Sequence, residues 1–157
     1  MSVSKVKSYA KINLALNVTG KLNLLHKIES IVLFIGLHDL IFIKKIKGPN
    51  HHISFYGKFS KNISKINTVE KLLKILDENR LLKNRKFQIK IKKNIPQKAG
   101  LGGGSMNAAN ILNFLIKKKF TKIKQKKIQN ICSLIGSDVI LGVNSASAIL
   151  TSNNSVK

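Results

Sequence analysis

A glycine cluster between two segments of different periodicity restricts this chain more than any other feature. Before it, from Phe87 to Ile91, apolar and polar residues alternate, which is typical of a strand with one buried face. After it, apolar residues recur at helical spacing at Ala108, Ile111, Leu112 and Leu115. The connecting stretch AGLGGGSMN holds four of the ten glycines of the chain. A strand, a glycine loop and a helix in this order predict a backbone that approaches a ligand closely.

The loop does not match the two familiar nucleotide-binding motifs. A Walker A loop needs a lysine before the serine, and none precedes Ser105. The dinucleotide fingerprint needs a glycine where Ser105 stands, and an acidic residue about 20 positions on, but no Asp or Glu lies between Glu78 and Asp138. What remains is a phosphate cradle made by the N–H groups of Gly102 to Gly104 at a helix start. A tightly packed turn without a ligand is the alternative.

The rest of the chain predicts an α+β fold, because strands and helices are mixed without a regular βαβ alternation. Alternation predicts a strand over Tyr9–Val18 whose buried face is formed by Ala10, Ile12, Leu14, Leu16 and Val18. Further strands are expected at Ser30–Leu37, Leu40–Ile46, Ile53–Tyr56 and Val139–Leu150, with a turn at Gly36–His38. Helices are expected at Thr68–Leu82, with Val69, Leu72, Leu73 and Leu76 inward, and at Ile123–Ile135, with Ile128, Ile131, Cys132 and Ile135 inward.

The formal net charge of +23 leaves two interpretations open. It fits a basic nucleic-acid-binding α+β module, which would bind a polyanion. It also fits a lysine excess produced by A+T-rich codons, because Arg80 and Arg85 are the only arginines and nucleic-acid surfaces more often use arginine forks. We favour the codon explanation and do not expect a nucleic-acid partner.

Cysteine and hydropathy predict a cytoplasmic protein. The single cysteine, Cys132, argues against a disulfide framework and a cysteine-ligated zinc site. The N-terminus lacks the apolar core of a secretory signal, and the most apolar stretch, Ile31–Ile43, is too short to span a membrane. We expect no bound metal at His26, His51 or His52, which are interpreted as solvated histidines.

Two residues outside the loop are candidates for chemistry. Asp138 is one of only six acidic residues, and a carboxylate there could act as a general base beside a cation. The sequence Gly136-Ser137-Asp138 is equally compatible with an ordinary turn. Lys11 projects from the polar face of the first strand, but by itself it is one basic residue among 29.

Three blocks in order resemble the GHMP kinase superfamily, and within it the 4-diphosphocytidyl-2-C-methyl-D-erythritol kinases. These blocks are AKINLALNVTG (Ala10–Gly20), PQKAGLGGGSMNAA (Pro96–Ala109) and IGSDVILGV (Ile135–Val143). The resemblance implies the N-terminal domain of that family, a ribosomal-protein-like mixed sheet packed against helices. It also implies an ATP-dependent kinase of isoprenoid precursor biosynthesis that phosphorylates the 2-hydroxyl of 4-diphosphocytidyl-2-C-methyl-D-erythritol.

The resemblance also implies a role for individual residues. Lys11 and Asp138 would be the catalytic pair. The phosphates of ATP, accompanied by Mg²⁺, would be held by Gly100, Gly102, Gly103, Gly104 and Ser105. Asn67 would lie on the adenine side, and the substrate, a cytidine diphosphate methylerythritol, would contact Asn13 and His26.

The chain departs from the family pattern at several places. Asn23-Leu24-Leu25 replaces the usual Asp-Gly-Tyr before His26, and Met106 replaces a second serine in the loop. We expect residues 1–150 to form the N-terminal ATP-binding domain and 151–157 a frayed or truncated tail. The C-terminal domain of the family is expected to be missing, or to be supplied by a separately encoded half. This predicts weak or absent kinase activity for the chain alone.

Overall fold

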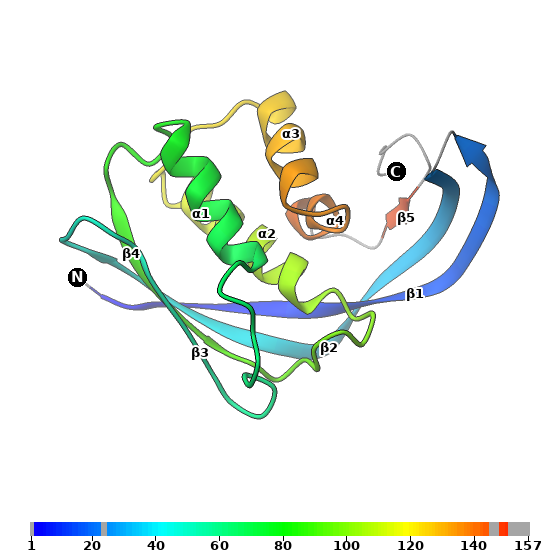
Figure 1. Ribbon diagram of the computed structural model, residues 1–157, viewed down its shortest axis with the longest axis horizontal. Coiled ribbons are helices and arrows are strands. Elements are labelled where there is room, and N and C mark those ends of the chain that lie inside the picture. Colours follow the sequence, from blue (N-terminus) through cyan, green and yellow to red (C-terminus); the bar gives the residue numbers. More distant parts are fainter. Residues whose placement is uncertain (1, 23–24, 145–147, 151–157) are drawn as a thin grey trace.

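The computed structural model describes residues 2–22, 25–144 and 148–150, with only the backbone described at 19, 21–22, 25–28 and 148–150. The expected tail, 151–157, lies outside the described residues. One mixed sheet is covered on one face by helices, as Figure 1 shows. The predicted α+β class is therefore confirmed.

The sheet is built around a long antiparallel hairpin. The strands of the sheet are β1 (Ser4–Leu22), β2 (Leu25–Ile46), β3 (His52–Tyr56), β4 (Lys86–Lys92) and β5 (Ala148–Leu150), and β1 and β2 form the hairpin. The order is β1-β2-β4-β3, with β5 paired to the other end of β2. β4 runs antiparallel to β2, whereas β3 and β4 are parallel. The hairpin extends past the helical layer and curls around its end, where β5 joins it (Figure 1).

In the described part of the chain, the second layer consists of four helices: α1 (Thr68–Glu78), α2 (Gly103–Lys117), α3 (Gln125–Ile135) and α4 (Val139–Asn144). The inward positions predicted for the first three helices are all buried. They pack on Phe87, Ile89 and Ile91 of β4 and on Ile41 and Ile43 of β2, so the two periodicities of the sequence meet in one core. Because β4 leads into the glycine loop and α2 follows it, this core fixes both ends of the loop.

The predicted turn at Gly36–His38 is wrong, because β2 continues through it. His38 pairs with Tyr9 and Phe34 pairs with Lys11, so the extra residues of β2 form an irregularity within the strand. The imidazole of His38 donates from Nδ1 to the carbonyl of Gly36, 2.7 Å away. Long-range pairing with β1 therefore prevails over local turn chemistry at this glycine.

The predicted strand Val139–Leu150 is also wrong over its first half, which forms helix α4. Gly142 allows α4 to approach α2 closely, since a Cβ placed there would lie 2.6 Å from Cβ of Ala109 and 2.9 Å from Sδ of Met106. Nδ2 of Asn113 on α2 donates to the carbonyls of Gly142 and Val143 at 3.3 and 3.0 Å. This packing between helices is a tertiary effect that the apolar run does not reveal.

The predicted buried face of the first strand is correct only at its start. Ala10 is buried, but Leu14, Leu16 and Val18 are exposed by 58%, 56% and 62%. The reason is that β1 shifts register between Asn13 and Ala15 and then leaves the part of the sheet that the helices cover. None of the helices that the structure describes is long and apolar enough to span a membrane.

Candidate active site

The glycine loop has the backbone of an anion-binding turn. Gly100 and Gly102 adopt φ angles of +73° and +67°, in the left-handed region that favours glycine. Gly102 is the N-cap of α2, and no side chain caps this end of the helix. The first-turn N–H groups of a helix have no intrahelical partner, and the first turn of α2 contains no acidic residue to bind them. The end of α2 is therefore available to an anion.

Lys11 of β1 is packed directly against this loop. Its backbone N–H donates to the carbonyl of Leu101 at 3.0 Å. Its aliphatic stem covers Gly102, where a Cβ would lie only 2.8 Å from Cγ of the lysine. Gly102 is thus required both for its backbone conformation and for the close approach of Lys11. Lys11 itself is 5% exposed, so its ammonium is held in one place.

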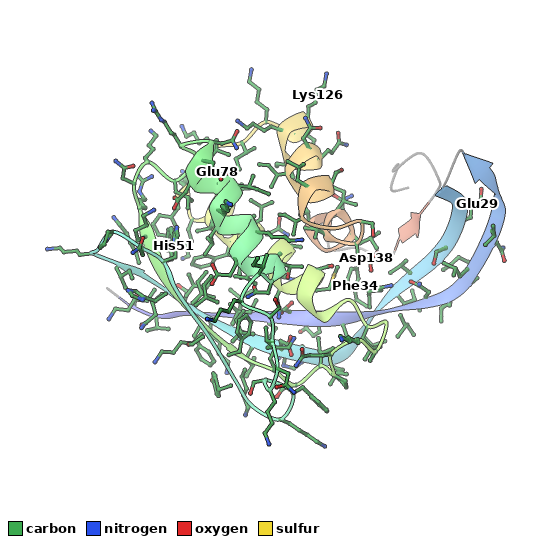
Figure 2. All side chains as sticks on the ribbon, viewed as in Figure 1. Glu29, Phe34, His51, Glu78, Lys126 and Asp138 are labelled. Carbon is green, nitrogen blue, oxygen red and sulfur yellow. The ribbon has the colours of Figure 1, made fainter. Side chains whose placement is uncertain are left out.

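Lys11 also joins the first and third sequence blocks. Its Nζ lies 3.3 Å from Oδ2 of Asp138 and donates to Oδ1 of Asn13 at 3.0 Å. Asp138 precedes α4, and in Figure 2 it lies between the helical layer and the β1–β2 hairpin. Its side chain is 32% exposed, so the carboxylate is both ion-paired and accessible. Lys11 and Asn13 of β1 thus form one polar cluster with Asp138, which is far from them in the sequence.

Ser105 is in the first turn of α2, directly after the glycine loop. Its Oγ is 3.8 Å from the position that a Cβ on Gly136 would take, so the hydroxyl lies beside the turn that carries Asp138. Met106, where the family has a second serine, is fully buried and packs with Val32 and Leu141. It is not among the residues that line the pocket described below.

A pocket of about 400 Å³ extends from the loop to the start of α1. Its lining includes the predicted phosphate-loop residues and Asn67. Oδ1 of Asn67 accepts from the N–H groups of Val69 and Glu70 at 3.0 and 3.1 Å, so this side chain caps α1. The structure thus places Asn67 on the wall of the pocket, whose lining does not include Lys11 or Asp138.

Sequence reasoning missed three polar residues at this site: Thr68 and Lys93 line the pocket, and Asp39 lies beneath it. Oγ1 of Thr68 donates to the carbonyl of Gly104 at 2.7 Å and so ties α1 to the loop. Below the loop, the buried carboxylate of Asp39 pairs with Lys93. The signal for Asp39 was present, since an acidic residue inside the apolar run Ile31–Ile43 must find partners when it is buried. The sequence pattern placed Asp39 only at the exit of the expected turn Gly36–His38.

Two histidine predictions have different outcomes. The side chain of His26 lies outside the described residues, although its backbone pairs with Lys21 in the hairpin. The interpretation of His51 as solvated is wrong. It accepts from the N–H of Phe87 at 3.1 Å through Nδ1, and its ring stacks on Phe87. Its Nε2 lies 3.2 Å from Oδ2 of Asp77 without hydrogen-bond geometry.

The assembled cluster can bind and transfer an anionic group. The helix end and the ammonium of Lys11 can stabilise negative charge, and the carboxylate of Asp138 can accept a proton from a hydroxyl placed against it. A cation within 3.3 Å keeps that carboxylate oriented. The combination fits phosphoryl transfer, in which positioning and charge stabilisation supply most of the catalysis.

Comparison with known proteins agrees with this geometry. The family described as "GHMP kinases N terminal domain" matches residues 67–151. A 4-diphosphocytidyl-2-C-methyl-D-erythritol kinase of Pelagibacter ubique (strain HTCC1062) is 61% identical over 157 residues, which is 100% of this chain and 56% of the relative. A kinase of the same name from Ureaplasma parvum serovar 3 is 34% identical over 138 residues, 86% of this chain and 51% of the relative. The chain spans about half the length of the curated relatives it matches.

Solved structures share the fold. A crystal structure of 4-(cytidine 5'-diphospho)-2C-methyl-D-erythritol kinase superposes with a TM-score of 0.78 at 21% identity, covering 98% of this chain and 54% of that one. The mevalonate kinase of Methanococcus jannaschii superposes with a TM-score of 0.65 at 16% identity, covering 99% and 55%. The alternative of a nucleic-acid-binding module finds no support in these similarities. The chain belongs to the GHMP kinase family and has the fold of its N-terminal domain.

Proposed function

We propose that this chain supplies the phosphate-binding and catalytic half of a kinase that transfers the γ-phosphoryl group of ATP to the 2-hydroxyl of 4-diphosphocytidyl-2-C-methyl-D-erythritol. The observation that carries the proposal is the Lys11–Asp138 pair, with Nζ and Oδ2 3.3 Å apart, beside the uncapped start of α2. The names of the relatives that match the whole or most of the chain support this choice of substrate.

Each residue then has a defined task. Asp138 takes the proton of the attacking hydroxyl, and Lys11 orients that carboxylate while its one remaining N–H donor is available to developing charge. The N–H groups of Gly103, Gly104 and Ser105 hold phosphate oxygens at the helix start. Lys11 is in turn positioned by Asn13, which lies beside the attacking hydroxyl in this proposal.

The nucleotide-binding part of the proposal uses the pocket between the loop and α1. Gly100 and Asn67 are both on its wall, which supports a nucleotide with its phosphates at the loop and its base toward α1. His26 would contact the cytosine of the acceptor substrate. A kinase acting on two anionic small molecules also gives the lysine excess a use that does not require nucleic acid.

Mg²⁺ is proposed as the companion of ATP. In phosphoryl-transfer enzymes it is held through phosphate oxygens and one or two protein ligands. The carboxylate of Asp138 and the hydroxyl of Ser105 are the oxygen ligands we propose, since Oγ of Ser105 lies 3.8 Å from the Cβ position of Gly136 in the turn that carries Asp138. In the part of the chain that the structure describes, no group of three His, Cys, Asp or Glu residues could hold a metal alone. When bound, Mg²⁺ would neutralise phosphate charge.

A second half of the enzyme completes the proposal. The curated relatives are about twice as long as this chain, so a C-terminal partner segment would contribute the rest of the substrate site. We also propose a cytoplasmic location, which is supported by the single cysteine of the chain, Cys132.

Phosphoryl transfer tests the proposal directly. The chain is assayed alone and joined to the C-terminal 44% or so of the Pelagibacter ubique relative, of which it covers 56%. ATP, Mg²⁺ and the cytidine diphosphate substrate are supplied, and ADP release is measured. We expect turnover in the joined protein and little or none in the chain alone. Absence of ADP release from the joined, folded protein would overturn the proposed function.

A further inference from the structure

A buried polar network lies beneath the glycine loop and joins β2, the end of β4 and α2. Its centre is Asp39, which is 0% exposed. Oδ1 of Asp39 accepts from the N–H groups of Asn94 and Ile95 at 2.8 and 2.9 Å. Oδ2 pairs with Nζ of Lys93 and accepts from Nδ2 of Asn107 at 2.9 Å. One carboxylate thus fixes the strand end before the loop and the helix after it.

Lys93 occupies the floor of the pocket. It is 4% exposed and is one of the residues lining the pocket. Gly103 lies directly on it, since a Cβ on that glycine would be 3.3 Å from Nζ. Among the residues the structure describes, Asp39 is the one partner of this ammonium, so two of its three N–H donors are unused.

Asn107 supplies a second unsatisfied group at the same place. Its amide nitrogen is bound to Asp39, but its Oδ1 is buried and has no hydrogen-bond partner. Buried polar atoms are normally hydrogen-bonded, so an unpaired one in a pocket wall is available to bind a ligand or a water molecule. Lys93 and Asn107 therefore both contact Oδ2 of Asp39 under the loop, and each keeps unused hydrogen-bonding capacity: donors on Lys93 and an acceptor on Asn107.

We infer that Asp39 is a positioning residue for the nucleotide: it orders the glycine loop and holds Lys93 where its free N–H donors meet the bound nucleotide. The loop has no lysine of Walker A type. Lys93 supplies a cation from the floor of the pocket instead. Its ion pair with Asp39 offsets the free-energy cost of burying the ammonium. This inference rests on the proposed function for its ligand, whereas the ordering of the loop does not depend on it.

The experiment separates positioning from simple stability. Asp39→Asn keeps Oδ1 for the two backbone N–H groups but loses the charge that holds Lys93. In the double variant Asp39→Asn/Lys93→Met the charge pair is removed altogether, and the new Nδ2 of residue 39 can donate to Oδ1 of Asn107 after the amide of Asn107 flips. Replacing both members of a buried pair is often nearly neutral for stability. Asp77→Asn, at the Asp77–Lys86 ion pair near the C-terminal end of α1, is the matched control.

Two readouts are measured on the full chain: the affinity for ATP with Mg²⁺, and hydrogen exchange at residues 94–106 compared with α1. We expect Asp39→Asn to weaken ATP binding at least tenfold and to raise exchange in the loop. The double variant should regain the melting temperature of the wild type but not its ATP affinity. Asp77→Asn should change the melting temperature alone.

Each outcome decides the inference. If the double variant binds ATP as well as the wild type does, Lys93 is no ligand and the inference is overturned, while the proposed function stands. If the wild type binds no ATP, the proposed function fails. In that case hydrogen exchange still tests whether Asp39 orders the loop. This role is rejected if Asp39→Asn leaves hydrogen exchange at residues 94–106 unchanged.

Discussion

Nζ of Lys11, in the first strand, lies 3.3 Å from Oδ2 of Asp138, close to the other end of the described chain. The stem of the same lysine covers Gly102, so one side chain connects the carboxylate to the glycine loop. The proposed catalytic pair therefore depends on the pairing of β1 with β2 and on the packing of α4 against α2. Substitutions that disturb any of these contacts should therefore change ATP binding or turnover.

Asp138→Asn should abolish most turnover in the joined protein described above. Removing a general base costs about 10²- to 10⁴-fold in rate, and the amide also loses the ion pair with Lys11. The measurement is the turnover number at saturating ATP, with Ser137→Ala, an exposed neighbour, as control. Turnover that survives Asp138→Asn would contradict the mechanism assigned to this carboxylate.

Gly102→Ala should weaken ATP binding more strongly than Gly100→Ala. Both positions carry a left-handed backbone, where a non-glycine residue costs about 1–2 kcal/mol. Only the alanine at 102 would also meet Cγ of Lys11 at 2.8 Å, because nothing lies within 4 Å of a Cβ at 100. ATP affinity is measured for both variants. Equal losses would show that backbone strain alone matters and that the contact with Lys11 does not.

Gly142→Ala should destabilise the fold by about 1–3 kcal/mol, since overpacking forces side chains from their rotamers. The new methyl group would lie 2.6 Å from Cβ of Ala109 and 2.9 Å from Sδ of Met106. Gly36→Ala is the control, because a Cβ there has no neighbour within 4 Å. Urea unfolding measures both. Similar midpoints for the two variants would contradict the close packing of α4 on α2.

His51 should make the fold less stable as the pH falls below about 6.5. Burial lowers the pKa of His51 below its ordinary value of 6.5, and the neighbouring Lys86 acts in the same direction, against Asp77. The unfolded chain therefore binds the proton first, so stability is full above 6.5 and is lost as the pH falls through the lower pKa of the folded state. Urea unfolding at pH 7.5 and 5.5 measures this loss.

His51→Asn is the control for that pH dependence. Its Oδ1 can still accept from the N–H of Phe87, but the side chain does not titrate. The variant should lose less stability than the wild type between the two pH values. An equal loss would assign the effect to other groups, such as Asp77.

Cys132 should be unreactive in the folded protein. It is 1% exposed, and burial raises the pKa of its thiol to about 11. At pH 8 only about one thiol in a thousand would be ionised, and the thiolate is the reactive form. Labelling with a thiol reagent should be slow in buffer and rapid in guanidinium chloride. Rapid labelling in buffer would mean that α3 opens from the core readily.

The sequence by itself determined the parts of this protein in which local pattern and burial agree. Period-two alternation located β4, helical spacing located α1, α2 and α3 with their buried faces, and the glycine cluster located the loop between β4 and α2. These features depend on neighbours within a few residues. The order of three sequence blocks was also sufficient to identify the family to which the chain belongs.

Only the tertiary structure decided the features that depend on distant partners. It made β2 continuous at Gly36, because β1 pairs across the irregularity. It made the segment after Asp138 a helix, because Gly142 permits contact with α2. It also brought Asp39 under the loop, where its two oxygens bind two backbone N–H groups, Lys93 and Asn107. A carboxylate inside an apolar run must be paired when it is buried, but the sequence does not contain the location of its partners.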